Sequence, residues 1–129
     1  MYASLYLSFM LGSVAMGTNP VGTYNDMETC KQAQSQLTVA GTKGMSIKSA
    51  CRETPMYYPS GPYLSGVLAG GKGTQAGKTP PYSELHVFED DEYETCVGAI
   101  KEMAKNMENE PAMHAVFFCV PIQKKVWLI

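Results

Sequence analysis

The sequence Asn-Asp-Met-Glu-Thr-Cys at residues 25–30 returns as Asp-Glu-Tyr-Glu-Thr-Cys at residues 91–96. Each copy is followed by a helix-like stretch, an apolar run and a second cysteine, which is Cys51 in the first copy and Cys119 in the second. The Glu-Thr-Cys triplets match in register, and all four cysteines of the chain fall at equivalent points. The sequence therefore predicts one structural unit that occurs twice.

Length and composition indicate one globular domain. Of the 129 residues, 45% are hydrophobic and 17% are charged, which is enough to bury a core. The formal net charge is −2 and the ten Lys and Arg residues are scattered, so no nucleic-acid partner is expected. We expect repeat one at about 1–55, a connecting loop at about 56–81, repeat two at about 82–122 and an apolar tail at 123–129.

The first residues are predicted to form a strand. Residues 1–17 are apolar and end in small residues, which is also typical of a secretory signal. However, no Lys or Arg precedes the apolar stretch, and Leu5, Leu7, Phe9 and Leu11 recur at every second position, as in a strand. No run approaches the ~20 apolar residues of a membrane span, so none is expected.

Each repeat is predicted to contain a helix that begins at its acidic motif. Asn25 with Glu28, and Asp91 with Glu94, have the spacing of a capping box. The acidic residues at 89–94 also complement the positive end of the second helix, which we favour over a cation site. The helices should therefore begin near residue 25 or 26 and near residue 91.

The apolar stripes predict how far these helices extend. The first is expected to end at Gly41 and Gly44, and the second at Asn109 and Pro111. The stripe of the first helix is Met27, Cys30, Ala33 and Leu37, and that of the second is Tyr93, Cys96, Val97, Ile100, Met103, Ala104 and Met107.

Strands are predicted after and before the helices. Residues 45–51 place Met45, Ile47, Ser49 and Cys51 on one face, whereas residues 112–120 are almost continuously apolar and suit a central strand buried on both faces. With strands at Leu5–Leu11 and Leu85–Phe88 before the helices, the pattern is β-α-β twice.

The expected fold class is therefore α+β: duplicated β-α-β units that form a ferredoxin-like sheet with two helices on one face. An alternative repeat opens each half with a hairpin. It rests on the likeness of Tyr6-Leu7-Ser8 to Tyr63-Leu64-Ser65, and adds strands near Val21–Tyr24 and Tyr63–Ala69.

The cysteine spacing can be compared with the geometry of a β-α-β unit. A helix of ten residues from Cys30 descends about 15 Å, and a strand that ends at Cys51 climbs about 17 Å, so the sulfurs return to one level. Cys96 and Cys119 are related in the same way. We predict the disulfides Cys30–Cys51 and Cys96–Cys119, with buried free thiols in a reducing cytosol as the alternative. Zinc is not expected, because no cysteine pair has short ligand spacing.

Two further motifs favour structural interpretations. Residues 71–79 contain Gly-Lys-Thr, but Lys72 stands where a phosphate loop requires glycine, and Pro80 follows instead of a helix, so a flexible glycine loop is expected. His86 and His114 have no Ser or Asp pattern beside them, so a catalytic triad is not supported.

Aromatic residues mark the candidate binding surface. Tyr57, Tyr58 and Tyr63 lie in a proline-rich loop, and tyrosine offers a large contact area at low entropy cost. Trp127 lies in the apolar end of the chain, which is either a final edge strand or an arm that docks on a neighbouring subunit. These residues predict a protein partner or self-association.

The chain resembles small uncharacterised two-cysteine-repeat proteins of marine bacteriophages. The likeness is carried by residues 24–34 with 50–51, and by residues 88–97 with 117–121. It implies a phage origin and no particular chemistry. The favoured function is a non-enzymatic interaction or assembly protein, either a virion decoration or accessory component or a host-facing factor, without metal or cofactor. A virion, extracellular or periplasmic location is favoured over the host cytoplasm.

The alternative is a small phage enzyme. Phage S-adenosylmethionine lyases are ferredoxin-like trimers with ligand pockets between subunits, and their Tyr and Glu flank the connection between the second and third strands. By that resemblance Tyr58 and Glu84 would hold and polarise a small-molecule ligand. The connection in this chain is far longer.

Overall fold

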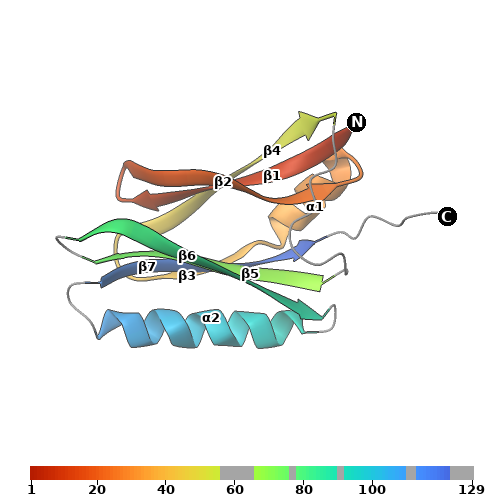
Figure 1. The fold of residues 1–129 in the computed structure, drawn as a ribbon. Coiled ribbons are helices and arrows are strands. Elements are labelled where there is room, and N and C mark those ends of the chain that lie inside the picture. The colour runs from red at the N-terminus through yellow and green to blue at the C-terminus, as the bar shows by residue number, and fades with distance from the viewer. Residues whose placement is uncertain (56–65, 76–77, 90–91, 110–112, 123–129) are drawn as a thin grey trace.

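The computed structural model describes the chain except residues 56–65, 76–77, 90–91, 110–112 and 123–129 (Figure 1). Its described part has the predicted α+β class. The elements in chain order are β1 (Tyr2–Leu11), β2 (Val14–Tyr24), α1 (Met27–Ser35), β3 (Thr38–Gly41), β4 (Met45–Thr54), β5 (Gly66–Gln75), β6 (Lys78–Glu89), α2 (Tyr93–Glu108) and β7 (Met113–Ile122).

The strands form two sheets rather than one. The first sheet has the order β2-β1-β4, and the second has the order β3-β7-β5-β6. All neighbouring strands in both sheets are antiparallel. Figure 1 shows the sheets stacked, with α2 beneath the second. The single ferredoxin-like sheet with both helices on one face is therefore not confirmed.

The two halves nevertheless share one order of elements. Each opens with a hairpin, β1-β2 or β5-β6, continues through a helix, and returns with a strand, β4 or β7, that pairs with the first strand of its hairpin. This matches the alternative repeat in outline. The simple β-α-β pattern is wrong because β2 intervenes between β1 and α1, and β5 separates β6 from β7.

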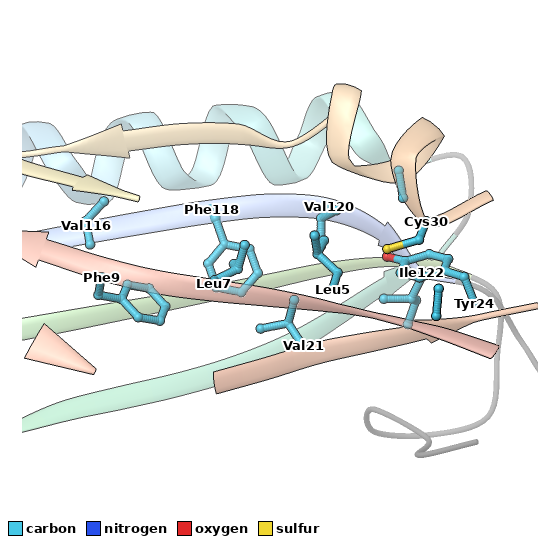
Figure 2. Close-up of a cluster of buried hydrophobic side chains, with 12 residues drawn as sticks. Leu5, Leu7, Phe9, Val21, Tyr24, Cys30, Val116, Phe118, Val120 and Ile122 are labelled. Atoms are coloured by element: carbon cyan, nitrogen blue, oxygen red, sulfur yellow. The ribbon is translucent and has the colours of Figure 1, made fainter. Parts of the chain in front are cut away.

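The main core lies between the two sheets. Leu5, Leu7 and Phe9 of β1 face Val116, Phe118 and Val120 of β7, and all six are buried (Figure 2). Both strands place every second residue on this interface, as the alternation of a strand requires. The hydroxyl of Tyr24 donates to the carbonyl of Pro121 over 2.5 Å and ties β2 to the far sheet.

A smaller core lies on the other face of β7. Ala115, Phe117 and Cys119 are buried there against Cys96 and Ile100 of α2. The prediction that this strand is buried on both faces is therefore confirmed. The N-terminal strand predicted over the first residues is confirmed as β1.

The first helix is shorter than predicted. It ends at Ser35, with Gln36 as its C-cap, so Leu37 lies beyond the helix and not on its apolar stripe. Leu37 still packs partly buried against the main core. The β-branched residues Thr38 and Val39 then start β3, which crosses to the second sheet and pairs with β7.

The glycine-rich segment predicted as a flexible loop is also strand. Gly66–Gln75 forms β5 between β7 and β6. At Gly71 an added Cβ would lie 2.2 Å from a ring carbon of Phe117, so this glycine makes room for a buried ring. Glycine here serves packing between strand and side chain rather than loop flexibility.

Candidate functional site

Both helices begin close to their predicted positions. Asp26 is the N-cap of α1, and its carboxylate accepts from the Thr29 backbone N–H over 2.7 Å. This backbone hydrogen bond lowers the pKa of Asp26 below its ordinary value of 3.8. In α2 the N-cap is Glu92, which makes no side-chain capping bond. Asp91, which the predicted capping box pairs with Glu94, lies outside the described residues.

Both predicted disulfides are present. Cys30–Cys51 joins α1 to β4, and Cys96–Cys119 joins α2 to β7. The helix α1 is entered from β2, which runs parallel to β4 because both are antiparallel to β1. The sulfurs of each pair therefore return to one level, as the spacing predicted. No free cysteine remains among the described residues.

The disulfides lie in different surroundings. Cys96, Cys119 and Cys30 are fully buried, whereas Cys51 is half-buried on the edge strand β4. Beside it, the side-chain amide of Gln34 donates to the backbone carbonyl of Ser49 over 3.1 Å and to its hydroxyl oxygen over 2.9 Å. The first helix is thus fixed to the edge strand β4 by the Cys30–Cys51 disulfide and by the hydrogen bonds of the Gln34 amide to Ser49.

The face of the first sheet that points away from the core presents polar and charged side chains to the solvent. We call it the outer face and define it by six residues from three strands. These are Tyr6 and Ser8 of β1, Thr18 of β2, and Lys48, Ala50 and Arg52 of β4. Thr18 and the three β4 residues are exposed, and the two β1 residues are half-buried.

Two contacts order the outer face. The Arg52 guanidinium lies over the Tyr6 ring, with its central carbon 5.6 Å from the ring centroid, in a cation–π arrangement. The hydroxyls of Ser8 and Thr18 lie 2.8 Å apart and share a hydrogen bond. The outer face thus presents a placed guanidinium, a second cation at Lys48 and a pair of hydroxyl groups.

Two hollows border α1. A hollow of about 220 Å³ lies between α1 and the end of β7, and its walls include Tyr24, Gln32 and Ile122. A second, of about 550 Å³, follows the solvent side of α1 along Met27, Lys31 and neighbouring polar residues. Both are open to solvent. The larger one also has Glu28 and Ser35 in its walls, and the Ser35 hydroxyl donates to the backbone carbonyl of Gln32 over 2.6 Å rather than to an acidic or basic side chain.

The aromatic candidates cannot be placed. Tyr57, Tyr58, Tyr63 and Trp127 lie outside the described residues, so their predicted binding role stays a prediction. Glu84 is on β6 opposite Gly71, but its side chain lies outside the described part. The pair proposed by resemblance to the lyases, Tyr58 with Glu84, is therefore not brought together by any described contact.

The described residues offer no grouped metal ligands and no membrane-spanning helix. His114 is half-buried on β7, opposite Thr74 of β5. Within the described ranges, no three His, Cys, Asp or Glu side chains are grouped so that they could hold a metal ion. The helices in that same part of the chain are too short or too polar to cross a bilayer.

Comparison with protein-family models, with curated proteins and with solved structures finds no match to this chain.

The outer face was not singled out from the sequence. Its signal was present, because Tyr6 and Ser8 alternate with the apolar residues of β1, and Lys48 and Arg52 alternate with those of β4. The alternation predicts that these residues share the solvent side of their own strand. Only the register of β1 with β4 shows that the two sets lie side by side.

Proposed function

We propose that this chain is a non-enzymatic binding or assembly protein, of phage origin, that works in an oxidising setting as a virion accessory component or a host-facing factor. The observation that carries the proposal is the pair of disulfides, each of which fixes a helix to the returning strand of its own half. Structural disulfides of this kind persist outside the reducing cytosol.

The surroundings of the disulfides support a structural role. Three of the four sulfur-bearing residues are fully buried, and buried cysteines of this kind are inert rather than catalytic. Each disulfide fixes the helix of one half to the returning strand of that half. A rigid scaffold of this type binds a partner with little loss of conformational entropy.

The outer face supports a binding role more directly. It is exposed along β4, and its guanidinium is held in place by an aromatic ring before any partner arrives. Placed polar groups on strands of a rigid sheet are more precise than groups on loops.

The test is the oxidation state and location of the protein in its natural source, prepared without reductant and with free thiols blocked. The proposal predicts a virion or extracellular fraction in which the intact mass lacks four thiol hydrogens and no cysteine takes up the blocking reagent. Four blocked cysteines in a soluble cytosolic fraction would overturn it.

A further inference from the structure

The charge of the first sheet differs from that of the chain. The chain carries twelve acidic residues and a net charge of −2, yet nine of the twelve follow Ser83. Strands β1, β2 and β4 together contain a single acidic residue, Glu53. Glu53 alternates with Arg52 and so does not share the outer face. The outer face is therefore a cationic surface on an acidic protein.

The two cations on the outer face lie in a line. Lys48 and Arg52 are on the same strand and four residues apart, which places them about 13 Å apart at the ~3.3 Å rise of a strand. The exposed Ala50 lies between Lys48 and Arg52, and its small side chain does not block a ligand that would contact both cations. A compact anion such as phosphate cannot reach both cations at once, whereas an extended chain with repeated negative groups can.

Neutral groups beside the cations indicate which kind of chain fits. The Ser8 and Thr18 hydroxyls bond to each other and keep further acceptor positions, so they can meet the hydroxyl groups of a sugar. Thr18 and the β4 residues are exposed and Ser8 is half-buried, so the hydroxyl row can be reached from the solvent.

Nucleic acid fits the face less well. Single-stranded nucleic acid is held by bases that stack on open aromatic rings and by many phosphate contacts. Here the Tyr6 ring is already covered by the Arg52 guanidinium, and the face offers two cations rather than a long basic groove. The oxidising setting of the proposed function also favours a partner that is found outside the cell.

We infer that the outer face of the first sheet binds an acidic polysaccharide, a chain of uronic-acid type. The carboxylates of the sugar chain pair with Arg52 and Lys48, and its hydroxyls bond to the Ser8–Thr18 row. This inference rests on the proposed binding function and names its partner class. The Arg52 guanidinium, stacked on Tyr6, is the specificity-determining group, because its fixed fork matches a carboxylate in a way that an ammonium does not.

The experiment is a calorimetric titration of the oxidised full chain with a short oligogalacturonate. We expect binding that weakens as salt rises, and none to a neutral maltooligosaccharide of equal length. The variant K48A/R52A should lose about tenfold or more in affinity. The variant R52K keeps the positive charge but lacks the planar guanidinium, so it should lose part of the affinity for oligogalacturonate. Circular dichroism should stay unchanged in both. The melting temperature should fall by at most a few degrees, because both side chains are exposed and only the Arg52–Tyr6 contact is lost in the double variant.

The matched control is K101A/K105A, which removes two exposed lysines, also four residues apart, from α2. It changes the net charge equally and should leave affinity as in the unchanged chain. Equal losses in the two double variants would show a non-specific charge effect and overturn the inference. Absence of oligogalacturonate binding would also overturn it.

Two further probes separate the partner classes. Tighter binding to oligothymidylate or to polyglutamate than to the sugar acid, with loss in K48A/R52A, would overturn the polysaccharide assignment while the binding function stands. A thiol-bearing cytosolic form, found as described above, would remove the proposed function itself.

Discussion

Removing each disulfide in turn tests how strongly each half is stabilised by its own disulfide. The pairs are separated by 21 and 23 residues, so the loops they close are nearly equal in length. The chain-entropy relation gives about 3.4 kcal/mol of stabilisation for each loop. The variants C30A/C51A and C96A/C119A should therefore both lose about 3 kcal/mol in the free energy of unfolding.

The burial of the sulfurs predicts a difference between the two variants. Cys96 and Cys119 are both fully buried, whereas Cys51 is half-buried. Truncation to alanine leaves unfilled space only where surrounding atoms enclose the site, so C96A/C119A should be less stable than C30A/C51A by about 1 kcal/mol. Alanine at Cys51 leaves a gap that water can fill.

The assay is urea unfolding followed by far-ultraviolet circular dichroism, without reductant. For an m-value of about 2 kcal/mol/M, a loss of 3 kcal/mol lowers the midpoint by about 1.5 M. The unchanged chain in excess dithiol, with both disulfides reduced, is the control and should be less stable than either variant. A midpoint for C30A/C51A equal to that of the unchanged chain would refute the reasoning.

Three further substitutions test particular contacts. Gly71→Ala should destabilise the protein by about 1–3 kcal/mol in urea unfolding, because its Cβ would lie 2.2 Å from a ring carbon of the buried Phe117. The control is Gly98→Ala in α2, where nothing lies within 4 Å of the added Cβ, and it should stabilise the protein by up to about 1 kcal/mol. Equal effects of the two substitutions on the free energy of unfolding would contradict this account. Tyr24→Phe should cost about 1 kcal/mol, since it leaves the carbonyl at the end of β7 without its donor, and an unchanged midpoint would count against that bond. Asp26→Ala should lower the melting temperature at pH 7, because it removes the N-cap of α1. Since folding lowers the pKa of Asp26, the carboxylate should stabilise the protein fully above its ordinary pKa of 3.8, and this stabilisation should disappear as the pH falls through the folded-state pKa. A difference in melting temperature between the two proteins that stays constant across this pH range would be the contrary result.

The parts of the fold that the sequence predicted correctly depend on local pattern. The cysteine spacing predicted both disulfides, although in the first half β3 lies between α1 and the returning strand β4. The continuous apolar run of β7 predicted a strand buried on both faces. The start of α1 was predicted to within one residue, but the cap is Asp26, which accepts from the Thr29 N–H, and not the Asn25 of the predicted capping box.

The parts that the sequence did not predict depend on contacts between distant residues. Nothing local to β5 shows that its Gly71 leaves room for Phe117, so the glycine-rich pattern alone predicts a loop there. The sequence predicts a longer α1 than is observed, because β3 forms by pairing with β7, which lies more than 70 residues away in the chain. The outer face likewise exists only through the register of β1 with β4.

The central claim is that the outer face of an oxidised, rigid scaffold is the working surface. The most direct test is a nuclear magnetic resonance titration of the isotopically labelled, oxidised chain with oligogalacturonate, read at each backbone amide. The account predicts shifts confined to β4 around Lys48 and Arg52 and to β1 around Tyr6. Shifts along α1 and its hollows, or on α2, with the outer face unchanged, would contradict it.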